Sequence, residues 1–258
     1  MRASRAVSRI MSALSFGGFA FYAAVLLGAF AVRSAAGFGA GLIAIPMLAL
    51  ILPVSTAVSV ATVFTALSSA QQVSREWRQI AWRQFLRIFL YSMVGVGLGL
   101  YFIKLLDEDL MRRLLGIFMI LYSIHSLRVT ETSRVLPARW HGPLGAGVGI
   151  VGGLCSAMFG AGAGPIYVVY FDILRLEKEV FRATMSAVVL LGGAARIAGY
   201  GTYGFYGKST LILLMVGLPL VAAGSWFGDR VVHRLSARSF SRVVAGIMLL
   251  SGVVLLSR

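Results

Sequence analysis

Two short glycine-rich stretches hold the residues best suited to chemistry in this chain. The first is GFGAG at 37–41, and the second is GAGAG at 160–164, directly followed by Pro165. Each stretch interrupts an apolar run, and each glycine weakens a helix by about 1 kcal/mol relative to alanine. Backbone polar groups freed within a bilayer are tolerated only inside protein or beside a water-filled cavity. Paired breaks in two halves of a chain are typical of transporter binding sites.

The two breaks predict a cradle for an anion. A helix that begins at a break directs its free N–H groups, and about half a positive charge, at whatever occupies the break. Pro165 suits the first helical position, where no N–H is required. The alternative interpretation is that the glycines only let helices approach closely. We favour the cradle, and we assign anion binding to Gly37, Phe38, Gly39, Ala40, Gly41, Gly160, Ala161, Gly162, Ala163 and Gly164.

Three arginines in or beside apolar segments are further candidate anion ligands. Arg33 precedes the first break, Arg182 lies in the stretch FRAT, and Arg196 follows the stretch GGAA. An arginine at membrane depth costs about 2.5–3.5 kcal/mol on insertion scales, so it is usually functional. The alternative for Arg33 and Arg196 is a side chain that reaches out to the interface, and for Arg182 it is the start of a span.

Neutral polar side chains in the apolar segments are weaker candidates, because each alone more often joins two helices than binds a ligand. The candidates of this kind are Ser34, Thr62, Gln71, Ser156 and Thr184. Asp172 is the acid that lies deepest in an apolar run. It is a candidate for taking up a coupling proton, and the alternative is that it faces the interface beside Arg175.

The sequence predicts neither an enzyme nor a metal or cofactor site. The three histidines are scattered, the single Cys155 lies in an apolar run, and no nucleophile stands in a recognisable pattern with a base. A nucleotide-binding loop of the GxxxxGK[ST] type is also absent from the sequence, which argues against a pump driven by ATP.

Composition places the chain in a membrane. Of its 258 residues 59% are hydrophobic and 13% are charged, whereas a soluble domain carries about 25% charged residues. The net charge of +15 comes from basic residues spread over short loops and span ends. We therefore expect no nucleic-acid partner, but cytoplasmic anchoring and contact with anionic membrane lipids.

Hydropathy predicts an all-α polytopic protein with about eight full spans and two glycine-broken segments that are re-entrant or half-helices. The spans are 11–32, 54–73, 85–106, 111–127, 143–159, 180–201, 211–228 and 243–256, and the short segments are 42–52 and 165–174. Counting the short segments as crossings would give ten spans, and 1–36 also has features of a signal peptide. With eight spans both termini are cytoplasmic, while the basic loop 230–238 falls on the opposite side.

An internal repeat divides the chain into a first repeat at 1–127, a connecting loop at 128–142 and a second repeat at 143–258. A shift of 123 residues superposes the two glycine-rich breaks, and a shift of 122 superposes Thr62 on Thr184. A shift of 129 superposes Gly95 and Gly99 on Gly224 and Gly228. The glycine matches carry most of the weight, because apolar residues match easily by chance.

The duplicated arrangement resembles the sulfite exporter TauE/SafE family. The resemblance rests on GFGAG with Pro46 following, on GAGAG followed by FRAT, and on the glycine-spaced spans through Gly99 and Gly228. It implies a transporter of sulfur-containing anions such as sulfite, sulfoacetate, thiosulfate or other organosulfonates, in a membrane of the bacterial inner-membrane type.

Our leading hypothesis is a secondary transporter that moves such an anion by alternating access around the two breaks. The alternatives are an anion channel and a membrane scaffold or assembly factor without a substrate. The expected partners are the small anion and membrane lipids, and a homodimer is among the assemblies that the sequence allows. Direction of transport and coupling ion are left open.

Overall fold

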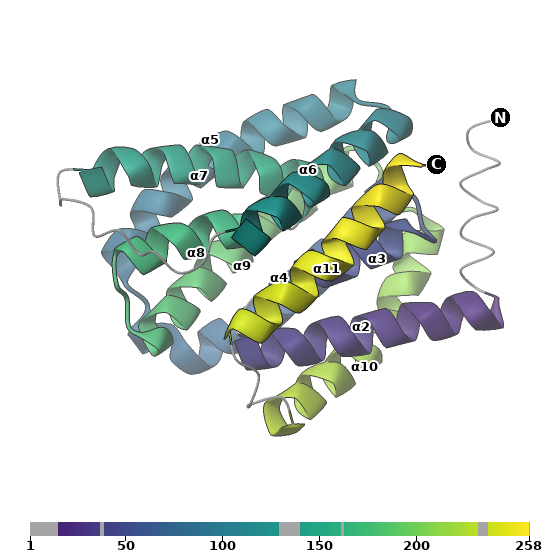
Figure 1. The fold of residues 1–258 in the computed structure, drawn as a ribbon, viewed down its shortest axis with the longest axis horizontal. Coiled ribbons are helices and arrows are strands. Elements are labelled where there is room, and N and C mark those ends of the chain that lie inside the picture. Colours follow the sequence, from purple (N-terminus) through teal and green to yellow (C-terminus); the bar gives the residue numbers. More distant parts are fainter. Residues whose placement is uncertain (1–14, 37–38, 129–139, 161–162, 232–236, 258) are drawn as a thin grey trace. The chain divides into compact units, whose positions relative to one another are not determined.

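The computed structural model describes residues 15–36, 39–128, 140–160, 163–231 and 237–257, and every regular element in these ranges is a helix. The all-α prediction is therefore confirmed for the described residues. The elements are α2 Phe16–Ala36, α3 Ala40–Ala49, α4 Val54–Glu76, the short 3-10 helix η1 Trp77–Gln79, α5 Trp82–Leu105, α6 Glu108–Arg128, α7 His141–Phe159, α8 Ala163–Ile173, α9 Lys178–Thr202, α10 Lys208–Val231 and α11 Ala237–Leu256 (Figure 1).

Within the described ranges, seven helices are long and apolar enough to cross a membrane, rather than the eight that we predicted. They are Phe16–Ser34, Val54–Gln79, Trp82–Leu105, Glu108–Leu127, His141–Phe159, Glu179–Thr202 and Lys208–Arg230. The predicted eighth span lies in α11, where Val244–Leu256 is a shorter apolar helix among the described residues. The eight-span count is thus not confirmed.

The chain packs as two compact units. Unit 1 contains α2, α3, α6, α10, α11 and residues 54–61 of α4, and unit 2 contains residues 62–76 of α4, η1, α5, α7, α8 and α9. Each unit draws helices from both predicted repeats. The compact units therefore do not follow the boundaries 1–127 and 143–258, and the repeat remains a prediction from the sequence.

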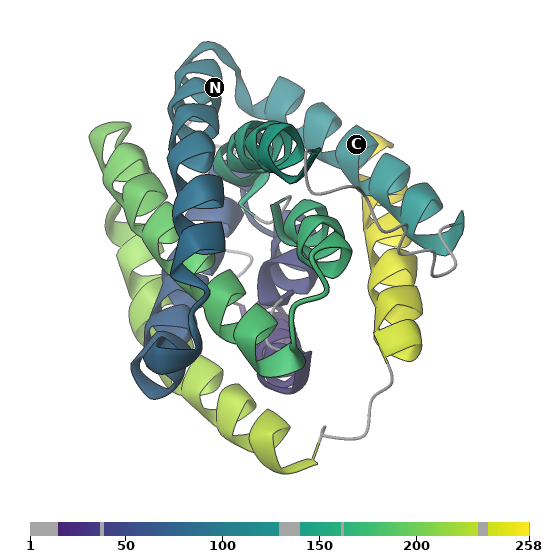
Figure 2. The same cartoon turned by 90° about the vertical axis from the view of Figure 1, so that its left-hand side faces the viewer.

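Unit 2 is built on a close contact between α5 and α7. A Cβ atom added to Gly95 would lie 2.0 Å from the carbonyl oxygen of Ile150, and one added to Gly99 would lie 2.8 Å from that of Leu154. Only glycine permits this approach of two backbones. Helix α5 also packs against α9, and Figure 2 shows it between α7 and α9.

Unit 1 contains a close contact of the same kind between α2 and α10. A Cβ atom on Gly224 would lie 2.7 Å from the carbonyl oxygen of Leu27, and one on Gly228 would lie 2.2 Å from that of Ala31. The hydroxyl of Tyr22 donates to the carbonyl of Leu213 at 2.7 Å and ties the same two helices. We call the α5–α7 and α2–α10 contacts the glycine seams.

The two glycine seams have matching registers. Gly224 and Gly228 stand 129 residues after Gly95 and Gly99, and the residues they meet, Leu27 and Ala31, stand 123 residues before Ile150 and Leu154. These are the shifts that align the predicted repeats. In each unit a glycine-bearing helix from one half of the sequence packs against the helix before the break of the other half.

Candidate functional site

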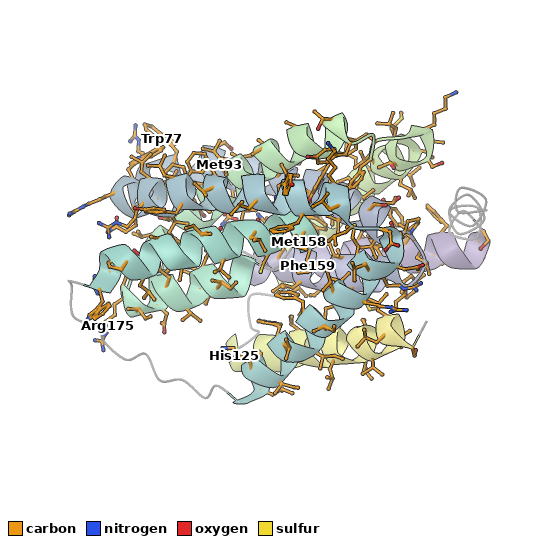
Figure 3. The ribbon with its side chains drawn as sticks, turned by 90° about the horizontal axis from the view of Figure 1, so that it is seen from above. Trp77, Met93, His125, Met158, Phe159 and Arg175 are labelled. Atoms are coloured by element: carbon orange, nitrogen blue, oxygen red, sulfur yellow. The ribbon has the colours of Figure 1, made fainter. Side chains whose placement is uncertain are left out.

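The second break lies at the tip of a helix hairpin. Helix α7 ends at Phe159, and Gly160 adopts a left-handed conformation with φ 71° while its N–H donates to the carbonyl of Ser156 at 2.8 Å. Helix α8 then returns along α7, because the hydroxyl of Tyr170 donates to the carbonyl of His141 at 3.1 Å. The two helices lie side by side (Figure 1), and Figure 3 shows Phe159 set back from Trp77 and Arg175 at one end of unit 2.

Arg196 of α9 holds the end of α7. Its Nη1 donates to the carbonyls of Ser156 at 2.8 Å and Gly160 at 3.0 Å, and its Nε donates to the carbonyl of Gly192 at 3.2 Å. The side chain is only 4% exposed. A cation at a helix C-terminus satisfies carbonyls that have no helical partner and complements the negative end of the helix dipole.

The remaining amino group of Arg196, Nη2, makes no hydrogen bond to any residue that the structure describes. Gly193 leaves room for it, since a Cβ atom there would lie 3.7 Å from Nη2. Next to Arg196, the hydroxyl of Tyr200 donates to the carbonyl of Ala157, and Ser156 donates to the carbonyl of Gly153 at 2.9 Å. Residues of α9 therefore fix the end of α7, and the Nη2 group of Arg196 can still donate hydrogen bonds.

A second polar contact lies one turn into α8. The hydroxyls of Tyr167 and Ser92 are 2.6 Å apart in the buried interior of unit 2. Tyr167 also fills the space beside Gly152, where a Cβ atom would lie 2.4 Å from its ring. The start of α8, which follows the break, is thereby fastened to both α5 and α7.

The first break is arranged differently. Gly39 caps α3 with φ 96°, a conformation that favours glycine, and its cap has no side-chain hydrogen bond. Helix α3 is buried along almost its whole length, including Ala40, Gly41 and the internal Pro46. Arg33 is buried at the end of α2, and Ser34 donates to the carboxylate of Asp229 on α10. Gly37, Phe38, Ala161 and Gly162 lie outside the described residues.

Two of the three candidate arginines cannot bind the same small anion directly. Arg196 follows Arg182 by fourteen residues on α9, which is about 21 Å along the helix axis. Arg182 pairs instead with Glu76 at the end of α4. Arg182 and Arg196 thus lie at two well-separated positions along the axis of α9.

The neutral candidates also divide by position. Thr62 is fully buried, and its hydroxyl has no hydrogen-bond partner in the part of the chain that the structure describes. The hydroxyl of Thr184 accepts a hydrogen bond from the N–H of Ala81 at 3.0 Å and so fixes the turn before α5. Gln71 is exposed on α4, and Asp172 is exposed near the end of α8, beside the turn that contains Arg175.

Sequence reasoning missed Glu76, Tyr200 and Asp229 as partners of the candidates. Tyr200 follows Arg196 by four residues, so their shared helical face was a usable signal. Nothing in the sequence pointed Glu76 at Arg182 or Asp229 at Ser34, because each pair is more than 100 residues apart. Among the described residues no group of three or more His, Cys, Asp or Glu side chains is placed to hold a metal ion.

A multi-pass helical membrane protein with two interrupted helices is the class that this fold and site define. The family model of the sulfite exporter TauE/SafE matches residues 21–255, and the chain belongs to this family of membrane transporters. The chain is also similar to the probable inner membrane transporter protein TsaS of Comamonas testosteroni, with 29% identity over 181 residues, 69% of this chain and 74% of that protein. No solved structure matches the chain.

Proposed function

We propose that the protein is a secondary transporter of small sulfur-containing anions, such as sulfite, sulfoacetate or other organosulfonates, and that it works by alternating access. The proposal rests on the surroundings of Arg196. Its guanidinium is buried at a helix break, and its Nη2 group makes no hydrogen bond to a described residue. A buried cation in an apolar protein is costly unless it is paired, and an anion arriving at the break would pair it.

The chemistry of this break suits one oxyanion group, either hydrogen sulfite or the sulfonate group of a larger anion. Guanidinium groups match oxyanions such as sulfonate in planar, directional hydrogen bonds, and the N-terminus of α8 supplies backbone donors on the far side of the break. One arginine, already facing the carbonyls of α7, balances one negative charge better than two. Family membership and the name of the similar protein support transport, and the substrate class follows the family's printed name.

Matching registers of the two glycine seams support the predicted repeat, and with it alternating access. Repeated halves that meet at broken helices are the architecture in which one set of helices rocks around a fixed site. At the first break, within unit 1, Gly39, Ala40 and Gly41 would contribute backbone donors to an anion, and Arg33 at the end of α2 is a further candidate ligand. Asp172 remains a candidate for coupling, although its exposed position gives it no special environment.

Membrane lipids are the second partner that we propose. Trp77 in η1 and Trp82 at the start of α5 are exposed, and the Cζ atom of Arg78 lies 5.4 Å from the centre of the Trp77 ring. Aromatic rings with arginines beside them are typical of the headgroup region of a bilayer. We propose an inner-membrane location like that named for the similar protein, with the η1 loop on the cytoplasmic side.

Flux into liposomes tests this function. The purified protein is reconstituted into liposomes. Uptake of sulfite, or of one of a panel of sulfonates, is measured against the concentration of the anion, with and without an ion gradient. Saturable uptake that responds to a gradient is expected, together with a higher melting temperature in the presence of the transported anion. Flux that does not saturate would identify a channel. A protein that neither moves nor is stabilised by any of these anions would be a scaffold.

A further inference from the structure

Helices α4 and α9 of unit 2 contact each other at two points. Glu76 near the end of α4 pairs with Arg182 near the start of α9. Ten residues before Glu76, Ala66 of α4 contacts α9 at Gly193, where an added Cβ atom would lie 3.2 Å from the Cβ of Ala66. The two helices therefore run in opposite directions. One turn beyond the Ala66 contact, Thr62 lies at the level of Arg196.

The residues on the two facing sides are unusually polar for apolar spans. The α4 side carries a polar residue at every turn, with the three-and-four spacing of one helix face: Thr62, Thr65, Ser69, Gln72 and Glu76. The α9 side has the same spacing with Arg182, Ser186, Val189, Gly193 and Arg196. We call these two faces together the polar seam. Gln72 belongs to it, whereas the predicted candidate Gln71 is exposed.

Two hydroxyls of the polar seam have unused hydrogen-bonding capacity. Ser69 donates to the carbonyl of Thr65 at 2.7 Å, so a hydroxyl on α4 can satisfy itself within its own helix. Thr62 and Ser186 are buried to 99% or more, yet neither hydroxyl has a hydrogen-bond partner among the described residues. Buried hydroxyls in this state normally contact a water or a ligand. Thr62 lies at the level of Arg196, and Ser186 lies one helical turn from Arg182.

Charge along the polar seam selects anions. Its ionisable residues are Arg182, Arg196 and Glu76, which gives one net positive charge. Arg182 pairs with Glu76, yet its Nε is buried without a hydrogen-bond partner among the described residues. An oxyanion could displace the carboxylate and use the guanidinium more completely than Glu76 does.

We infer that the polar seam of unit 2 is the path along which the anion moves between the second break and the end of the unit, with Arg196 as the inner station and Arg182 as the outer one. This inference rests on the proposed function. At the outer station the anion and the carboxylate of Glu76 compete for Arg182, so Glu76 acts as an exchangeable counter-ion. Thr62 donates a hydrogen bond to the anion at the inner station, and Ser186 donates one between the stations.

Cysteine labelling tests the path. In a Cys155→Ala background, which removes the only cysteine, Thr62→Cys and Ser186→Cys are each treated with 2-sulfonatoethyl methanethiosulfonate and with its cationic trimethylammonium analogue. We expect the anionic reagent to react about tenfold faster than the cationic one, because the path carries net positive charge. Excess transported sulfonate should slow the reaction. The matched control is Leu67→Cys, 48% exposed on α4 off the seam, where sulfonate should have no effect.

A charge test covers the case in which a cysteine variant does not fold. Arg182→Gln leaves the Glu76 carboxylate facing the path, and sulfonate flux should fall about tenfold through like-charge repulsion. Glu76→Gln should lower the KM for sulfonate, because the competitor of the anion is gone. The double variant should recover part of the flux lost in Arg182→Gln, whereas a purely structural ion pair predicts no recovery.

The results separate the two proposals. If the Cys155→Ala background moves no sulfonate or sulfite, the proposed function fails, and the reagent preference at 62 and 186 still decides whether an anion path exists. If the background transports sulfonate while the seam cysteines show neither charge preference nor protection, and the double variant recovers nothing, the polar seam is not the path.

Discussion

The two glycine seams are alike, whereas the two helix breaks are not. In both units a glycine pair brings backbones together at corresponding positions, Gly95 and Gly99 in one and Gly224 and Gly228 in the other. At the second break Arg196 donates to the carbonyls that end α7. At the first break Arg33 lies on the broken helix itself, and Ser34 contacts Asp229. Two similar glycine contacts thus accompany two different arrangements of charge.

This difference teaches that framework and site place different demands on the residues. Only glycine fits where a Cβ atom would lie about 2 Å from the backbone of the neighbouring helix. The same residue type is therefore found at each contact of this kind. A helix end needs only some donor for its carbonyls, and a guanidinium from a neighbouring helix or a short polar side chain can each provide it. The predictions below test whether the seams are equivalent and whether the breaks differ.

The largest effect is expected at the glycine seams. Gly95→Ala and Gly228→Ala each press a methyl group against a backbone carbonyl, and we expect each to cost about 3 kcal/mol of folding free energy. The matched controls are Gly97→Ala and Gly28→Ala, where nothing lies within 4 Å of the added carbon. Melting temperatures of the purified variants measure the effect. If only one seam is sensitive, the two seams are not equivalent.

A somewhat smaller effect is expected from the arginines at the breaks. Arg196→Lys loses hydrogen bonds to the carbonyls of α7 and should cost about 2 kcal/mol of stability, with reduced sulfonate affinity. Arg33→Lys keeps the charge but loses bidentate recognition, so affinity should fall while the melting temperature stays near normal. Both quantities are measured on the same preparations. Unchanged affinity in the Arg33 variant would mean that Arg33 only reaches toward the interface.

The left-handed glycines provide the next comparison. Gly39 caps α3 with φ 96° and Gly160 ends α7 with φ 71°, and alanine at either position should cost about 1–2 kcal/mol. Valine at Gly39, and likewise at Gly162, should abolish anion binding because it fills the cradle. Melting temperature and ligand affinity separate the causes. Lost stability with affinity retained in the folded fraction would assign these glycines to packing.

The smallest effect is expected from two buried tyrosines. Tyr200→Phe removes the donor to Ala157 beside the second break, and Tyr22→Phe removes the donor to Leu213 beside a glycine seam. Each should cost about 1 kcal/mol. Only Tyr200→Phe should also raise the KM for sulfonate, because it alone supports a break. Equal KM values in both variants would contradict a special role for the α9 contacts.

Much of the fold followed from local properties of the sequence. Apolar length predicted seven of the helices now seen as candidate spans, and glycine clusters predicted both interruptions, because helix formation depends on neighbouring residues. The predicted eighth span is not confirmed, because the described apolar part of α11 is the shorter helix Val244–Leu256. The repeat shifts also came from the sequence, and the glycine contacts agree with them without testing them directly.

The partners of the polar side chains were decided by tertiary structure alone. The sequence set Arg182 and Arg196 as equal candidates, but packing of α9 gave the first to Glu76 and the second to the carbonyls of Ser156 and Gly160. Of the neighbouring glutamines, Gln72 is half-buried and donates to Glu76 at 3.4 Å, whereas Gln71 is exposed. Hydrogen bonds and ion pairs join residues up to 204 positions apart, and hydropathy carries no information about which helices meet. The sequence determined where the helices break, and packing determined which charges meet there.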